Sequence, residues 1–163
     1  MVFDTYGDTS MPALVLLHGA ALLDTFSHQY DALIEHFHVL VPHLPGAGEA
    51  AAEPYDPQAV SDALAVWIAS LGIGKVAIMG HSIGGQLAVK LVSEHPALFS
   101  RAVFLSAWVC STEASARFFA ATAKMSYSAI KNAKLLRMQA KYWDLSPEQT
   151  DKLVSYSPRI PLE

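Results

Sequence analysis

A serine flanked by glycines is the residue of this chain with the clearest chemical potential. The segment Gly80-His81-Ser82-Ile83-Gly84 matches G-x-S-x-G and lies between the apolar run Val76–Met79 and a helical pattern. A strand that turns sharply into a helix holds such a serine in a strained backbone conformation, with its Oγ above the end of the sheet. The N-terminus of that helix offers free N–H groups to a developing oxyanion. The pattern predicts a nucleophilic Ser82; the alternative is a serine that only caps the helix.

Two further segments also follow apolar runs directly. His18-Gly19-Ala20 follows Ala13–Leu17, and Pro42–Gly48 follows His38–Val41. The first of these segments supplies backbone N–H groups where the first crossover begins.

The elements that must position these loops alternate along the chain. Short apolar runs, which are typical of buried strands, are separated by segments with a period near 3.6 residues. This order predicts an α/β fold, with a mostly parallel sheet covered by helices on both faces and Val2–Gly7 as an edge strand. The expected strands are Ala13–Leu17, His38–Val41, Val76–Met79 and Ala102–Leu105, and the expected helical stripes are Phe26–Phe37, Val60–Leu71 (with Asp56 as N-cap and Pro57 in the first turn) and Ile83–Val92.

The rhythm changes in the last third of the chain. Residues 112–156 show only helical patterns, with a capping box at Ser146–Gln149. We therefore expect two units, an α/β core over residues 1–110 and a helical segment over residues 111–163.

The three loop motifs together resemble the α/β-hydrolase superfamily, in its lid-bearing esterase and lipase-like branch, and the likeness covers the N-terminal portion of that fold. The resemblance implies that Ser82 is the nucleophile, that the backbone N–H groups of Ala20 and Ile83 form the oxyanion hole, and that His18 braces its loop. It also implies that residues 111–163 are a lid. His43, Ala47 and Ala50 depart from the residues usual in the family, which puts the rigidity of that loop in question.

A catalytic acid and histidine are not found where the family has them, after strands that follow the lid. The only histidine after Ser82 is His95, about three turns away along the same helical pattern. Glu113 is a weak candidate for the acid, with a solvated helix start as the plainer interpretation. The sequence thus lacks the C-terminal strands of the fold, and we expect this chain by itself to be an inactive or weak esterase.

Aromatic and methionine side chains in the helical segment have two open interpretations. They form either the packed underside of the lid or the lining of an apolar acyl pocket. The residues concerned are Phe118, Phe119, Met125, Tyr127, Met138, Tyr142 and Trp143.

Composition limits the remaining classes. The 163 residues are 52% hydrophobic with a net charge of −4 and no basic cluster, which argues against a nucleic-acid partner. No signal peptide and no membrane span is recognisable, so the cytoplasm is the default location. His28, His36 and His38 have no metal-type spacing, and no G-x-G-x-x-G follows a strand, so neither metal nor cofactor is expected.

Two functions remain. The first is a serine hydrolase of carboxylic esters or related acyl substrates that acts through an acyl-enzyme at Ser82. The second is a catalytically incomplete hydrolase-fold module that binds an apolar small ligand or a partner chain. An open sheet edge would in either case favour self-association.

Overall fold

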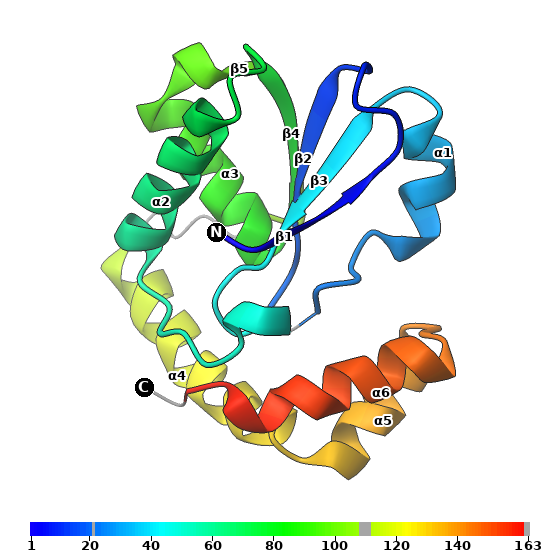
Figure 1. The fold of residues 1–163 in the computed structure, drawn as a ribbon. Coiled ribbons are helices and arrows are strands. Elements are labelled where there is room, and N and C mark those ends of the chain that lie inside the picture. Colours follow the sequence, from blue (N-terminus) through cyan, green and yellow to red (C-terminus); the bar gives the residue numbers. More distant parts are fainter. Residues whose placement is uncertain (21, 108–111, 162–163) are drawn as a thin grey trace.

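The fold is a five-stranded sheet with helices on both faces and a group of helices at one end (Figure 1). The computed structural model describes residues 1–20, 22–107 and 112–161, with only the backbone of residue 119 and residues 123–130. The expected boundary at residue 110 lies outside these residues. The α/β architecture predicted from the sequence is confirmed.

The sheet has the strand order β1-β3-β2-β4-β5, and its strands are parallel except for β1, which pairs antiparallel with β3. All four predicted apolar strands and the N-terminal edge strand are therefore present. The strands are β1 (Phe3–Tyr6), β2 (Ala13–Leu17), β3 (His38–Pro42), β4 (Val76–His81) and β5 (Phe99–Leu105).

Helices connect the parallel strands, as α1 does between β2 and β3, α2 between β3 and β4, and α3 between β4 and β5. In Figure 1, α2 and α3 lie on one side of the sheet, α1 lies on the other, and α5 and α6 lie below the end of the sheet. The helices are α1 (Tyr30–Ile34), α2 (Pro57–Ser70), α3 (Ile83–Glu94), α4 (Glu113–Ile130), α5 (Ala133–Tyr142) and α6 (Pro147–Tyr156), with short 3-10 turns η1 (Ser27–Gln29), η2 (Gly48–Ala50), η3 (Pro96–Leu98) and η4 (Ser157–Arg159).

The alternation of side chains along β2 supplies both halves of the core. Val15 packs into a cluster with α2 and α3, whereas Leu14 and Leu16 pack into a second cluster on the opposite face. All five residues of β2 are buried. A strand buried on both faces must be apolar throughout, which explains why the sequence pattern identified β2.

Local signals set the helix ends. The Oδ1 of Asp56 accepts a hydrogen bond from the Ala59 N–H at 2.7 Å, so α2 begins where the N-cap signal predicts. The capping box of α6 is also formed, with Ser146 and Gln149 bonded reciprocally. The stripe Phe26–Phe37 is shorter as a helix than expected, because its first part forms a turn and η1 before α1 begins.

The second core cluster joins the C-terminal helices to the sheet. Leu136 of α5 and Leu153 and Tyr156 of α6 are buried in it. The Leu23 N–H donates to the Tyr156 hydroxyl at 3.4 Å, and the Arg159 guanidinium donates to the Gly48 carbonyl at 3.1 Å. These contacts fix the position of α5 and α6 against the loops that follow β2 and β3.

Of the side chains expected on the underside of the C-terminal helical segment, some are packed and others are exposed. Trp143 packs against the second cluster, as expected, but Phe118, Met138 and Tyr142 are 65%, 67% and 88% exposed. That part of the prediction is wrong, because Leu136, Ala140 and Leu153 occupy the packed face instead. The side chains of Phe119, Met125 and Tyr127 lie outside the described residues.

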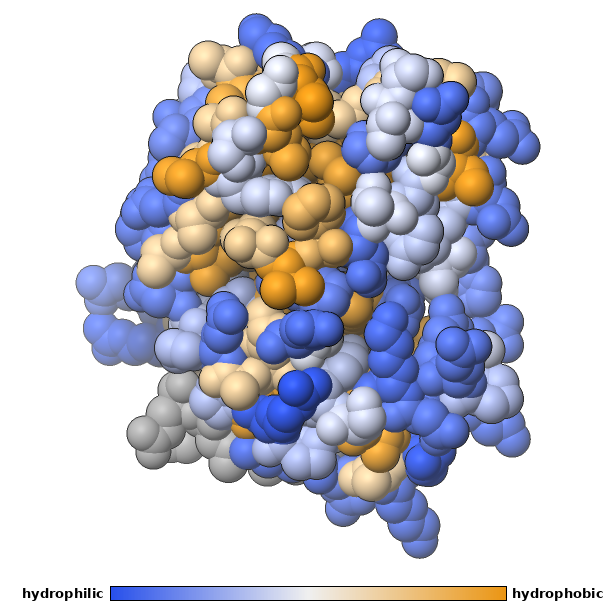
Figure 2. Space-filling model, viewed as in Figure 1, coloured by the Kyte–Doolittle hydropathy of each residue, from blue (hydrophilic) through white to orange (hydrophobic). Residues whose placement is uncertain are grey.

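Strand β5 forms an open edge of the sheet. Val103, Phe104 and Leu105 at its end are 42%, 44% and 40% exposed. Edge strands with apolar exposed side chains favour pairing with another strand, and self-association through β5 remains a prediction. Apolar surface also gathers around the N-terminal segment and α2, where Met1, Val2 and Val66 are exposed (Figure 2).

Among the described helices, none combines the length and the apolar character that crossing a membrane requires.

Candidate active site

Ser82 occupies the turn between β4 and α3 in a conformation that L-residues rarely adopt. Its φ is 55° and its ψ is −117°, and its N–H donates to the Leu105 carbonyl at 2.9 Å. Such a backbone costs about 1–3 kcal/mol and persists only where surrounding structure enforces it. The Ser82 side chain makes no capping hydrogen bond to α3. The interpretation of Ser82 as a simple helix cap is therefore wrong.

The neighbouring glycines allow this turn to form. A Cβ at Gly80 would collide with the backbone of Gly84, and a Cβ at Gly84 would collide with the Leu17 and His18 carbonyl oxygens. Both positions must lack a side chain for β4, α3 and the end of β2 to approach so closely. The G-x-S-x-G spacing thus has a steric cause in this chain.

Ser82 lies in the wall of a cavity of about 920 Å³. Ala20 lines the same cavity, which also extends to Leu136 and Trp143 of the C-terminal helices. Ile83 is the first residue of α3, so its N–H has no acceptor within the helix. Within the described part of the chain, no hydrogen bond occupies the Ala20 N–H. Among the described residues, neither of the two backbone donors expected for an oxyanion hole has a hydrogen-bond acceptor, and their role remains a prediction.

His18 joins two loops beside the cavity. Its Nδ1 donates to the Gly19 carbonyl at 2.7 Å, while its Nε2 accepts from the Leu44 N–H at 3.1 Å. Burial lowers the pKa of His18 to about 4, so the imidazole is neutral near pH 7. A neutral ring with one donor and one acceptor satisfies both partners. The prediction that His18 braces its loop is confirmed.

His43, which stands where the family usually has an aspartate, also supports a loop. Its Nδ1 accepts from the Glu49 N–H at 3.1 Å, and its Nε2 lies 3.3 Å from the Asp4 carboxylate. Gly48 has a φ of 54°, and a Cβ there would lie 2.8 Å from His43 Nδ1. His43 therefore supports the loop after β3 through its Nδ1, whereas its Nε2 makes no hydrogen bond among the described residues. Ala47 and Ala50 of the same loop are buried.

Neither His95 nor Glu113, the candidates for a catalytic base and acid, lies near Ser82. His95 caps the far end of the twelve-residue helix α3, about 18 Å from Ser82 along the helix axis. Glu113 is 87% exposed at the start of α4 and pairs with Arg117 at 2.7 Å. Within the described part of the chain, no hydrogen bond reaches the Ser82 Oγ from any side chain.

Two other histidines line the cavity. His81 precedes Ser82, and its Nδ1 is buried without a hydrogen-bond partner among the described residues. His28 is exposed and lies in the cavity wall with Asp24 and Gln139. No sequence pattern pointed to His28, Asp24 or Gln139, because they come from a loop and a helix that meet only in the folded chain.

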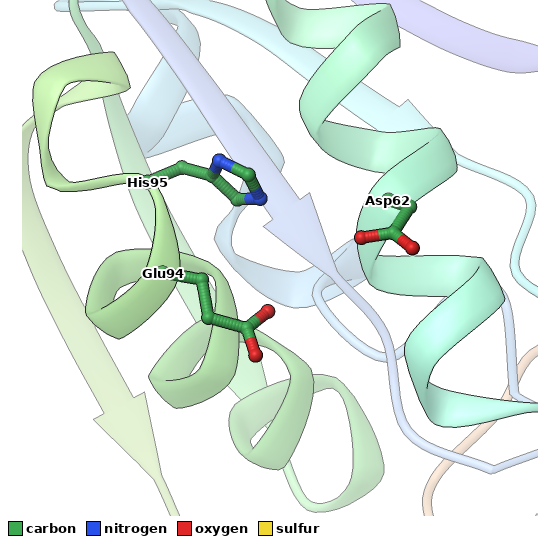
Figure 3. Close-up of side chains that lie close together, drawn as sticks. All are labelled: Asp62, Glu94 and His95. Carbon is green, nitrogen blue, oxygen red and sulfur yellow. The ribbon is translucent and has the colours of Figure 1, made fainter.

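A separate group of polar side chains, none of which lines this cavity, lies where α2 meets the end of α3. Asp62 of α2 and Glu94 and His95 at the end of α3 point toward one another, with ligand atoms within 4.8 Å (Figure 3). Lys90 pairs with Glu94 at 2.5 Å, and the Ser61 hydroxyl donates to it at 3.4 Å. These partners already satisfy the Glu94 carboxylate, so the group has the character of a polar contact between two helices.

The chain belongs to the alpha/beta hydrolase family, whose sequence profile matches residues 14–159. It is 29% identical over 114 residues to RutD of Yersinia enterocolitica, provisionally named a carbamate hydrolase, covering 66% of this chain and 41% of RutD.

Solved structures have the same fold. A provisionally named lipase from Acinetobacter baumannii superposes with a TM-score of 0.76 at 19% identity, over 96% of this chain and 57% of the lipase. A structure reported with carboxylesterases of Nitrososphaera gargenis superposes with a TM-score of 0.69 at 19% identity, over 99% of this chain and 63% of that one. The chain thus spans less than two thirds of these relatives.

Proposed function

We propose that this chain carries the nucleophile and the oxyanion hole of a serine hydrolase that cleaves carboxylic esters or related acyl compounds. The observation that carries the proposal is the strained backbone of Ser82 at the β4–α3 turn, where Ser82 lines the cavity. A serine forced into this conformation without a capping bond costs stability, and such strain is typical of functional positions.

The chemistry follows from the donors around that serine. The Ser82 Oγ attacks the acyl carbon and loses its proton to a base, while the carbonyl oxygen becomes an oxyanion that accepts hydrogen bonds from Ala20 N–H and Ile83 N–H. The alcohol leaves with a proton, and the acyl group remains on Ser82. Water then attacks the acyl-enzyme, which releases the acid and restores the serine.

The family membership and the hydrolases among the structural relatives support the reaction class. The helical segment over residues 111–163 serves in this proposal as the lid, because its residues Leu136 and Trp143 complete the cavity. A binding module is the second candidate, and it is favoured by the absence of a base on the Ser82 Oγ among the described residues. Loss of a triad histidine costs several orders of magnitude in rate.

Hydrolysis of p-nitrophenyl butyrate tests the proposal. We expect slow release of p-nitrophenol above the buffer rate, and we expect Ser82→Ala to abolish it. Ser100→Ala, which changes an exposed serine on β5, should retain the full rate. Equal rates for Ser82→Ala and the unaltered chain would contradict the nucleophile assignment. A chain without activity that still binds small apolar esters would favour the binding module.

A further inference from the structure

A carboxylate lies in the wall of the cavity that holds Ser82. Asp24 lies in the loop after β2, and its side chain is only 15% exposed. Within the described part of the chain, the Asp24 carboxylate accepts no hydrogen bond, and its one ionic contact is Lys152 at 3.8 Å. A largely buried carboxylate normally accepts several hydrogen bonds or a close ion pair, because burial without them is costly. Asp24 therefore has acceptor capacity that faces the cavity.

The existing counter-ion is a poor competitor for that capacity. Lys152 of α6 is 46% exposed and does not line the cavity. An ammonium at 3.8 Å on a long, solvated side chain contributes little and can be displaced at small cost. Burial raises the pKa of Asp24, and Lys152 lowers it only in part.

The cavity wall has one carboxylate and no lysine or arginine. Among the described residues that line it, Asp24 is the single member of the set Asp, Glu, Lys and Arg. Phe26 and Trp143 contribute aromatic rings to the same wall. A wall that holds both a carboxylate and aromatic rings is suited to an alkylammonium group, which gains ionic and cation–π attraction there.

We propose that the cavity selects substrates carrying a positively charged, partly apolar group, and that Asp24 is the specificity residue that binds this group. The inference rests on the proposed function for the position of the ester at Ser82. It deepens that function by naming the substrate class as esters with an alkylammonium group in the acyl or the alcohol part.

A pair of isosteric esters provides the direct test. Butyrylcholine carries a trimethylammonium group, and 3,3-dimethylbutyl butyrate has the same shape with carbon in place of nitrogen. Binding of each to the Ser82→Ala chain is measured by calorimetry, so that hydrolysis does not interfere. We expect the cationic ester to bind at least about fivefold more tightly at low salt, with the preference shrinking as salt is added.

Charge variants separate a local effect from a general one. Asp24→Asn should remove the preference, while binding of the neutral ester stays within about twofold. Glu35→Gln removes a charge from an exposed residue after α1 that does not line the cavity, and it should leave the preference intact. Lys152→Ala, which removes the competing ammonium, should increase the preference.

The outcomes for the two proposals are distinct. Equal binding of the two esters, binding of neither, or equal loss in Asp24→Asn and Glu35→Gln would overturn the role of Asp24. A preference that persists while no Ser82-dependent hydrolysis of either ester occurs would support the charged subsite and contradict the proposed function. Ser82-dependent hydrolysis of both esters at the same efficiency would support the proposed function and contradict the charged subsite.

Discussion

The backbone N–H of Leu44 donates to Nε2 of His18 at 3.1 Å, which joins the loop after β2 to the loop after β3. The same ring donates from Nδ1 to the Gly19 carbonyl, next to the Ala20 N–H that we assign to the oxyanion hole. The position of that donor therefore depends on a buried imidazole. A change to the His18 ring should therefore lower the stability of the fold and also alter the geometry of the cavity.

Replacement of this ring should be costly. His18→Ala leaves the buried Leu44 N–H without an acceptor and opens a void, so we expect a loss of about 2–4 kcal/mol in the free energy of unfolding. Urea denaturation followed by circular dichroism measures the change. His36→Ala, at an exposed position, should cost less than about 0.5 kcal/mol. A loss of equal size in both variants would contradict the bracing role.

The low pKa of His18 predicts a specific dependence of stability on pH. The folded chain keeps His18 neutral down to about pH 4, whereas the unfolded chain binds a proton near pH 6.5. The unfolded state thus binds more protons between these values, and stability falls as the pH drops from about 6.5 to 4, by about 3 kcal/mol in total.

Urea titrations at several pH values between 7.5 and 4 measure this slope. His18→Gln, which cannot titrate, should be less stable at pH 7.5 and should lose less stability across the same range. Identical slopes in both proteins would place the pH dependence on other groups.

The strain at Ser82 predicts that glycine is better tolerated there than alanine. At a φ of 55° the Cβ of alanine retains the strain, and glycine relieves it. After the entropy that glycine costs in the unfolded state, Ser82→Gly should be more stable than Ser82→Ala by about 1 kcal/mol. At Ser100 on β5, the order of the glycine and alanine variants should be reversed. Thermal denaturation of the four variants provides the comparison.

The sequence was sufficient to predict the sheet because its inner strands are apolar on both faces. All of β2 is buried, and in β4 the residues Ala77 and Met79 are partly buried on the face opposite to Val76 and Ile78. The predicted runs Val76–Met79 and Ala13–Leu17 agree with the bounds of β4 and β2 to within two residues. Strand β5 begins three residues earlier than expected, because Ser100 and Arg101 interrupt the apolar run at an exposed edge.

The packed faces of the C-terminal helices could not be predicted from the sequence. Helical periodicity predicts which residues share a face of a helix, but not which other surface that face packs against. The prediction that Met138 and Tyr142 face inward is therefore wrong, because both side chains are exposed. Ser82 could be placed because a single local turn determines its backbone. Asp24 could not, because its environment is made by α6, which is far away along the chain.

A base supplied from solution should accelerate the reaction at Ser82. No side chain among the described residues is bonded to the Ser82 Oγ, and the cavity of about 920 Å³ can admit an imidazole molecule. We expect imidazole to raise the Ser82-dependent rate of p-nitrophenyl butyrate hydrolysis by about tenfold or more, since general bases contribute factors of this order.

Pyrazole, which has the same shape but is a far weaker base, should have no such effect. The Ser82→Ala rate in imidazole is subtracted, because imidazole itself attacks activated esters. A chain that is already fast without imidazole, and whose rate vanishes in Ser82→Ala, would mean that a base within the protein serves Ser82.

The central claim is that Ser82 forms an acyl-enzyme, and mass spectrometry after mixing the chain with p-nitrophenyl butyrate tests it most directly. Deacylation also needs a base to activate water, so without one the intermediate should persist long enough to observe. We predict one butyryl group per chain, on the peptide that contains Ser82, and none in Ser82→Ala. A butyryl group on another residue, or an adduct that remains in Ser82→Ala, would contradict the account.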